Sequence, residues 1–212
     1  NKMLELNGVK NIIFDLGGVI LNIDYGQTAN AFMKIGVANF DKIYSQAKQG
    51  QVFDKLETGD LTPDEFREYI KEIVPSLQFS DIDKAWNAML LDLPIQRIDL
   101  LKKLKKKYRL FLLSNTNEIH IKCFRKIIES SYGKNIFDDV FEHQYYSSDI
   151  GMRKPNAECF QYVLEKNSLE PSETLFIDDS IQHVEGARKL KIKAYHLTPE
   201  EDITTLFLDK AQ

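Results

Sequence analysis

Short apolar runs that end in polar residues alternate with longer segments of helical period along much of the chain. The clearest run is Ile12-Ile13-Phe14, and comparable runs lie in segments 109–115 and 174–180. Segments 140–148 and 193–197 are less regular candidates for strands. Continuous apolar runs of this length are typical of parallel strands that are buried on both faces.

Three segments between these runs have apolar residues at helical spacing, at positions 118–130, 156–167 and 181–190. In the last of them, Gly186 and Ala187 are small and favour close packing of the helix against the sheet. Strands that alternate with helices predict an α/β fold, with a Rossmann-like parallel sheet covered by helices on both faces.

Residues 24–92 interrupt this alternation and contain no convincing strand. Thr62 and Glu65 have the spacing of a capping box, and Pro63 occupies the first helical position between them. We therefore expect an all-helical cap at residues 24–92, inserted after the first strand. The α/β core would then consist of residues 1–23 and 93–212.

Two helices of this insertion are defined by their pattern. In the first, apolar residues fall on one helical face, at Phe66, Ile70 and Ile73. The second occupies the segment SDIDKAWNAML, where Ser80 is expected to be the N-cap.

Composition and charge exclude some functions. The chain has 212 residues, of which 43% are hydrophobic, enough for one core and a smaller appended unit. With 28 Lys and Arg against 32 Asp and Glu, the formal net charge is −4, so there is no electrostatic reason to expect nucleic acid or an anionic membrane as a partner. The lysine-rich segment 100–110 is expected to be the solvated face of a helix.

The cysteines and the N-terminal segment indicate where the protein is found. Cys123 and Cys159 have no metal-binding spacing, and two free thiols favour a reducing compartment. The segment NKMLELNGVK lacks the apolar stretch of a signal peptide, so we expect a cytoplasmic protein.

Polar side chains stand at the ends of three predicted strands: Asp15, then Ser114 and Asn115, then Asp178 and Asp179. In open parallel sheets, ligands bind beyond the carboxyl ends of the strands. Three carboxylates in one place repel one another unless a cation lies among them, and Mg²⁺ prefers such oxygen ligands. The sequence therefore predicts a magnesium site.

Further residues supply what a phosphate group needs. Ser114 and Asn115 offer hydrogen-bond donors, and Lys154, in the loop GMRKPN, offers a positive charge. A carboxylate beside such a pocket can act as a nucleophile through an aspartyl-phosphate, which points to a small phosphorylated metabolite as substrate.

These motifs resemble those of the haloacid dehalogenase (HAD) superfamily. The matching segments are FDLGGV, LLSN, RKP and FIDDS, in that order and over nearly the whole chain. Their spacing is similar to that of members with a helical cap after the first strand. The resemblance is greatest to sugar-phosphate phosphatases typified by α-glucose-1-phosphatase and to the phosphatase domain of soluble epoxide hydrolases.

The resemblance implies a role for each residue. Asp15 would be the nucleophile and a Mg²⁺ ligand, and Lys154 would pair with it and with the phosphate. The carbonyl of Gly17 would be a further Mg²⁺ ligand. The other implied roles are metal binding by Asp178 and Asp179 and binding of the phosphoryl group by Ser114 and Asn115.

Gly17 departs from the usual phosphatase pattern, which has a second Asp at this position to protonate the leaving group. General acid–base catalysis is worth about 10²–10⁴-fold, so the substrate needs a good leaving group, such as a sugar 1-phosphate, or another residue must replace the acid. Glu57, Asp60 and Tyr25 are cap candidates. His183 is either a partner of the active-site loops or a residue of the helix surface.

Two other functions remain open at this stage. A metal-independent 2-haloacid dehalogenase also lacks the second Asp, but has no use for the acidic pair Asp178-Asp179. A catalytically weakened protein that binds a phosphorylated ligand would not need Asp15. The motifs favour a Mg²⁺-dependent phosphatase of a small phosphorylated metabolite, with a sugar phosphate as the expected substrate.

Overall fold

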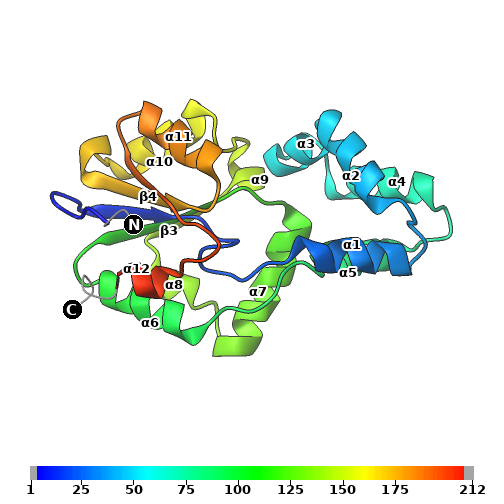
Figure 1. The fold of residues 1–212 in the computed structure, drawn as a ribbon, viewed down its shortest axis with the longest axis horizontal. Helices are drawn as coiled ribbons and strands as arrows, with labels where there is room; N and C mark the ends of the chain where they lie inside the picture. The colour runs from blue at the N-terminus through cyan, green and yellow to red at the C-terminus, as the bar shows by residue number, and fades with distance from the viewer. Residues whose placement is uncertain (1–3, 208–212) are drawn as a thin grey trace.

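The computed structural model describes residues 4–207, and the predicted core positions 1–3 and 208–212 lie outside these residues. Its centre is a five-stranded parallel sheet in the order β3-β2-β1-β4-β5 (Figure 1). The strands are β1 (Asn11–Phe14), β2 (Arg109–Ser114), β3 (His143–Tyr146), β4 (Thr174–Asp178) and β5 (Lys193–His196). The predicted α/β fold with a parallel sheet is confirmed.

Helices cover both faces of this sheet. Successive residues of a strand point to opposite faces, so each strand contributes to two apolar clusters. Ile12 and Phe14 belong to one apolar cluster and Ile13 to another. The first cluster includes residues of α6 (Ile95–Leu104), α7 (Glu118–Tyr132), α8 (Phe137–Val140) and α12 (Ile203–Leu206). The second includes residues of α10 (Ala157–Asn167) and α11 (Ile181–Lys189).

The remaining helices are those of the segment between β1 and α6, together with two short helices. Five helices follow β1: α1 (Tyr25–Lys34), α2 (Phe40–Gln49), α3 (Val52–Thr58), α4 (Pro63–Ile73) and α5 (Phe79–Asn87). They form a lobe beside the sheet in Figure 1 and share an apolar cluster to which α7 contributes Ile119. The short helices are α9 (Ser147–Ile150) and the 3₁₀ helix η1 (Pro171–Glu173). No helix among the described residues is long and apolar enough to cross a membrane.

The two connections to this lobe run side by side. The amide of Asp24 donates to the carbonyl of Met89 at 2.8 Å, and the amide of Leu91 donates to the carbonyl of Asn22 at 2.9 Å. Both pairs lie next to the predicted cap limits at residues 24 and 92.

Local sequence signals were right at one helix start and wrong at another. The capping box of Thr62 and Glu65 is formed at α4, with both hydrogen bonds at 3.1 Å. Ser80 is not the N-cap of α5. The N-cap is Gln78, two residues earlier, and its amide donates to the Asp81 carboxylate at 3.0 Å.

Other predictions about helix faces are confirmed in part. Phe66 and Ile70 of α4 are buried, but Ile73 is 40% exposed. In the lysine-rich segment the apolar residues point inward as expected: Leu100, Leu101 and Leu104. The predicted strand at 140–148 is shortened to β3, because its ends belong to α8 and α9.

Candidate active site

The sheet order brings the polar strand ends together at one edge. β1 lies between β2 and β4, with Phe14 opposite Leu112 on one side and Ile177 on the other. Asp15 follows Phe14, and its amide donates to the carbonyl of Ile177 at 3.0 Å. Asp15 is therefore flanked by Ser114 at the end of β2 and Asp178 at the end of β4, and all three residues are buried.

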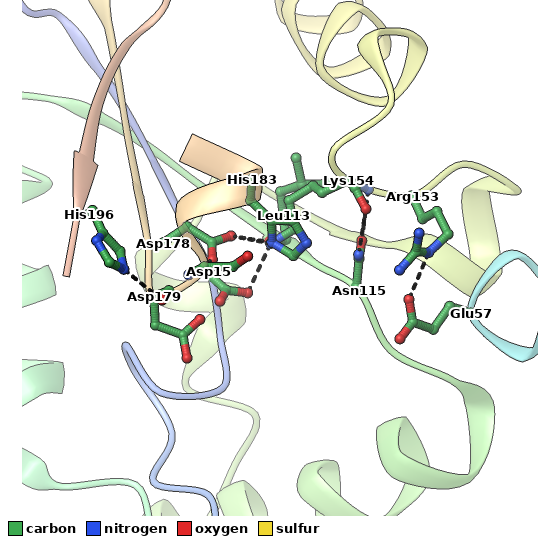
Figure 2. Close-up of polar contacts among 11 residues, drawn as sticks. Asp15, Glu57, Leu113, Asn115, Arg153, Lys154, Asp178, Asp179, His183 and His196 are labelled. Atoms are coloured by element: carbon green, nitrogen blue, oxygen red, sulfur yellow. Dashed lines mark hydrogen bonds and ion pairs between the residues drawn. The ribbon is translucent and has the colours of Figure 1, made fainter. Parts of the chain in front are cut away.

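Lys154 reaches this edge from the loop before α10, and its side chain is fully buried. Its Nζ lies 2.9 Å from Asp15 Oδ1, 2.8 Å from Asp178 Oδ2 and 2.8 Å from the carbonyl oxygen of Leu113 (Figure 2). An ammonium group has three donors, and these contacts use all of them. Lys154 thus holds the carboxylates in place, and its predicted contact with phosphate would require it to exchange a partner.

The backbone around Lys154 is fixed by contacts on two sides. The side chain of Asn115 accepts from the amide of Lys154 and donates to its carbonyl, both at 2.9 Å. On the other side, a Cβ on Gly186 would lie 2.8 Å from the carbonyl oxygen of Pro155. Gly186 therefore packs against the Lys154 loop, while Ala187 is buried in the cluster that includes Ile13 and Phe176 of the sheet, as predicted.

Three carboxylates make up the acidic part of the site. Oxygen atoms of Asp15, Asp178 and Asp179 all lie within 4.8 Å of one another. Burial and the negative charge of Asp178 raise the pKa of Asp15 well above its usual range, although Lys154 acts in the opposite direction. Burial also raises the pKa of Asp179. The pKa of Asp178 is lowered, because the charges of Lys154 and His183 outweigh its burial.

This donor set fits a divalent cation. One lysine charge lies among three carboxylates, so the cluster keeps an excess of negative charge when all three are ionised. A hard cation with oxygen ligands removes this repulsion, and Mg²⁺ is bound in this way in many phosphate sites.

The two glycines after Asp15 have different neighbours. Gly18 has a φ of +79°, and a Cβ there would lie 2.3 Å from Asp179 Oδ2, so only glycine allows this carboxylate to approach. Gly17 is not in the left-handed region, and a Cβ there would lie 3.2 Å from Cδ1 of Ile23. Ile23 therefore borders the position where the usual second Asp would begin.

A family model for haloacid dehalogenase-like hydrolases matches residues 9–191. The chain belongs to this family. The predicted resemblance to HAD proteins is confirmed, and the edge that carries Asp15 is the expected place for a HAD active site.

Other proteins resemble this HAD chain over nearly its full length. D-ribitol-5-phosphate phosphatase of Bacteroides thetaiotaomicron is 32% identical over 188 residues, which are 88% of this chain and 91% of that protein. A crystal structure of a HAD family enzyme from the same organism is 39% identical, with a TM-score of 0.87 over 94% of this chain and 98% of that one. The wild-type form of that enzyme is also known in complex with magnesium and inorganic phosphate, with a TM-score of 0.84, 39% identity and coverage of 94% and 99%.

Two histidines of the HAD chain contact its acidic cluster. His183 Nδ1 lies 3.0 Å from Asp178 Oδ2, so this residue is a partner of the site rather than a residue of the helix surface alone. His196, which lies in β5, has its Nε2 3.0 Å from the carbonyl oxygen of Asp179 and donates to it. Both contacts are drawn in Figure 2.

The three candidates for a replacement acid are not equivalent. The carboxylate of Glu57 accepts from Arg153 Nε at 2.9 Å, next to Lys154. Asp60, in the loop after α3, accepts from the hydroxyl of Thr58 at 2.9 Å. Tyr25 packs against Tyr44, with ring centroids 4.8 Å apart. Of the three, Glu57 directly contacts the loop of Lys154, through Arg153.

His120 is a buried titratable residue whose environment the sequence did not indicate. It lies in the first turn of α7, stacks on Trp86 of α5 at 4.6 Å, and its Nδ1 lies 2.8 Å from Asn87 Oδ1. Burial lowers its pKa to about 3, so the ring is neutral near pH 7. The amide oxygen of Asn87 can only accept, so Nδ1 carries the hydrogen. Periodicity alone did not predict which residues of the insertion contact His120.

Proposed function

We propose that this protein is a Mg²⁺-dependent phosphatase that hydrolyses a small phosphorylated metabolite, a sugar phosphate, through an aspartyl-phosphate on Asp15. The observation that carries the proposal is the position of Asp15, which is held by Lys154 at 2.9 Å within a cluster of three carboxylates. The relative that acts on D-ribitol 5-phosphate and the related structure with magnesium and phosphate support it.

In this mechanism Asp15 attacks the phosphorus atom as the bond between phosphorus and the ester oxygen breaks. The alcohol leaves, and because Gly17 offers no acid, its oxygen takes a proton from solvent. Lys154 bonds Oδ1 of Asp15, which orients the carboxylate and leaves Oδ2 for the attack. The hydroxyl of Ser114, at the end of β2, would donate to the transferring phosphoryl group, with Asn115 beside it. Water then cleaves the acyl-phosphate and regenerates Asp15.

The proposed magnesium ligands are Asp15, Asp178, Asp179 and the carbonyl of Gly17. The ion would neutralise negative charge on the phosphoryl oxygens and allow the carboxylate to approach them. His183 and Lys154 both bond Asp178 Oδ2, and the amide of Ser180 donates to Asp178 Oδ1 at 2.8 Å, so the protein orients both oxygens of this proposed ligand. Second contacts of this kind orient metal ligands in proteins.

We also propose that residues 24–92 act as a cap over a core formed by residues 1–23 and 93–212. The hinge would lie at Asn22–Asp24 and Met89–Asp92, the paired connections through which the chain enters and leaves the insertion. A cap that closes over the sheet edge excludes water from the reacting groups.

One observation favours a second candidate, the metal-independent 2-haloacid dehalogenase. Gly17 provides no side chain to protonate an alcohol, and a halide leaves without a proton. The cluster of Asp178 and Asp179 beside Asp15 argues against it, because a reaction without a cation would leave these carboxylates to repel one another.

The test is release of phosphate and of halide by the purified protein. We expect phosphate from a panel of phosphorylated metabolites that includes sugar 1-phosphates and ribitol 5-phosphate, with Mg²⁺ and not with a chelator present. No halide should be released from 2-haloacids. Halide release without metal, and no release of phosphate, would establish the dehalogenase instead. No activity in either assay would favour the remaining alternative, a protein that binds a phosphorylated ligand without turning it over.

A further inference from the structure

An ion pair joins the helical insertion to the loop of Lys154. Arg153 Nε donates to Glu57 Oε2 at 2.9 Å (Figure 2). Arg153 Nη2 lies 3.5 Å from Asp54 Oδ1. Asp54 and Glu57 are three residues apart on α3, so both lie on the face that meets the core. Of the two, Glu57 is the inner residue, with a side chain 24% exposed against 48% for Asp54.

The backbone of the active-site loop determines where Arg153 lies. Arg153 precedes Lys154, so their Cα atoms are about 3.8 Å apart. The backbone of Lys154 is bonded at its amide and its carbonyl by Asn115, which fixes where Arg153 begins. The Arg153 side chain therefore begins next to Lys154 and ends at Glu57 of the insertion (Figure 2).

The pair keeps unused hydrogen-bonding groups. Within residues 4–207, the hydrogen bonds of Glu57 and Arg153 leave Oε1 of the carboxylate and Nη1 of the guanidinium without a partner. One is an acceptor and the other a donor, and both are charged. A hydroxyl group donates one hydrogen bond and accepts others, so it matches such a pair.

A row of aromatic rings in the insertion reaches Phe53 of α3, the helix that carries Glu57. The rings of Tyr25 and Tyr44 are 4.8 Å apart, and those of Tyr44 and Phe53 are 4.5 Å apart. Burial and the negative charge of Glu57 raise the pKa of Tyr44, which indicates that its hydroxyl lies within the field of that carboxylate. The region combines aromatic faces, a phenol and an ion pair.

We infer that Glu57 and Arg153 are specificity-determining residues that bind hydroxyl groups of the leaving group, so that the substrates are phosphate esters of polyhydroxylated carbon chains. The inference rests on the proposed phosphatase activity. In a bound substrate, the phosphoryl group lies at Asp15 and the hydroxyls of the chain reach the ion pair. An ester without hydroxyls leaves the charged atoms of the pair without these bonds.

The experiment compares esters that differ in their hydroxyl groups. The hydroxylated ester is ribitol 5-phosphate or glucose 1-phosphate, whichever the wild-type protein hydrolyses faster, and the reference is pentyl phosphate. We expect Glu57→Ala to lower kcat/KM for the hydroxylated ester by about 10- to 100-fold, the range for a hydrogen bond to a charged group. The value for pentyl phosphate should change less than about twofold by the same argument.

Three further variants complete the comparison. Glu57→Gln keeps the volume of the side chain and should lower kcat/KM for the hydroxylated ester by a smaller factor. Arg153→Met should lower this value as much as Glu57→Ala does. Asp64→Asn is the control, because this carboxylate of the same insertion is 74% exposed and bonded to Arg67 at 2.8 Å, and it should leave both values unchanged.

Several results would overturn the inference. If both Glu57 variants lower hydrolysis of both esters equally, the ion pair only holds the insertion against the core. If they change neither, or if the wild-type protein prefers pentyl phosphate, the pair does not read hydroxyl groups. Hydrolysis of p-nitrophenyl phosphate reports the chemistry separately. If the wild-type protein releases phosphate from none of these esters, the proposed function fails, and the inference fails with it.

Discussion

The ammonium group of Lys154 lies 2.9 Å from Oδ1 of Asp15, a residue 139 positions away in the sequence, and both side chains are buried. Lys154 also bonds Asp178 at 2.8 Å, so one cation holds two carboxylates at neighbouring strand ends. Burial lowers the pKa of Lys154, but the charges of Asp15 and Asp178 outweigh it and raise the pKa above its ordinary value. The lysine is therefore charged, and its removal affects folding as well as catalysis.

Lys154→Met is expected to lower the free energy of unfolding by about 3–5 kcal/mol at pH 7, because it leaves buried carboxylates unpaired. Chemical denaturation monitored by circular dichroism measures this. Lys10→Met is the control, since Lys10 pairs with Glu173 at 2.7 Å but its side chain is 70% exposed. This variant should unfold as the wild type does, and an equal loss in the two variants would contradict the account.

Gly18→Ala is expected to weaken magnesium binding. A Cβ at Gly18 would lie 2.3 Å from Asp179 Oδ2, so the carboxylate must move away from the cluster. The Mg²⁺ concentration for half-maximal phosphate release should rise by about tenfold or more, equivalent to at least about 1.4 kcal/mol.

The control for this variant is Gly133→Ala. Gly133 has a φ of +74° and nothing within 4 Å of its Cβ position, so it shares the backbone strain without the contact. Its unfolding free energy should fall by about 1–2 kcal/mol with no change in the Mg²⁺ requirement. If the two variants require Mg²⁺ equally, Gly18 does not act through Asp179.

Gly17→Asp is expected to restore a general acid when Ile23 gives it room. The Cδ1 atom of Ile23 lies 3.2 Å from the Cβ position of Gly17, but Ile23 is 42% exposed and can be shortened. Relative to Ile23→Ala alone, the double variant Gly17→Asp/Ile23→Ala should raise kcat for alkyl phosphates by about tenfold or more, below the full range of general acid catalysis.

Hydrolysis of p-nitrophenyl phosphate serves as the reference for the Gly17 variants, because its leaving group departs with little need for a proton. An equal gain on both substrates, or none on alkyl phosphates, would show that the lack of an acid at Gly17 does not limit the rate.

His120 is expected to make the stability of the protein depend on pH. Burial lowers its pKa from 6.5 to about 3, so the unfolded chain binds a proton more readily than the folded one. The contribution of neutral His120 is therefore complete above pH 6.5 and is lost as the pH falls toward 3. Between pH 7 and pH 5 this loss amounts to about 2 kcal/mol.

The variant His120→Phe tests this dependence, because it keeps a ring against Trp86 and removes the titrating group. Unfolding free energies of both proteins at pH 7 and pH 5 give the comparison. The decrease on acidification should be smaller in the variant by about 2 kcal/mol. If both proteins lose the same stability, the protonation of His120 is not coupled to unfolding.

The sequence predicted the strand ends well for a physical reason. Apolar runs buried on both faces are unambiguous, and parallel strands place their carboxyl ends at one edge. The fold class therefore predicts Asp15, Ser114 and Asp178 at one edge, and the strand order of the structure, with β1 between β2 and β4, makes them neighbours. Lys154 was assigned to the same site from the motif RKP.

The contacts of the helical insertion were harder to predict. Glu57 and Arg153 are 96 positions apart, and His120 meets Asn87 across 33 positions. Neither pair has a periodic signal, because the first depends on how α3 meets the loop of Lys154 and the second on how α5 packs against α7. The role of Gly18 likewise follows from the approach of Asp179, and the misplaced N-cap at Ser80 from the competing bond between Gln78 and Asp81.

Phosphate release by Asp15→Asn measures the central claim most directly. The variant keeps the shape of the side chain but removes the nucleophile, and its folding can be verified by circular dichroism. The account predicts Mg²⁺-dependent phosphate release by the wild-type protein and a decrease of at least about 10³-fold in the variant, the scale of loss for a removed nucleophile. Phosphate release by the variant at a rate close to that of the wild type would contradict it.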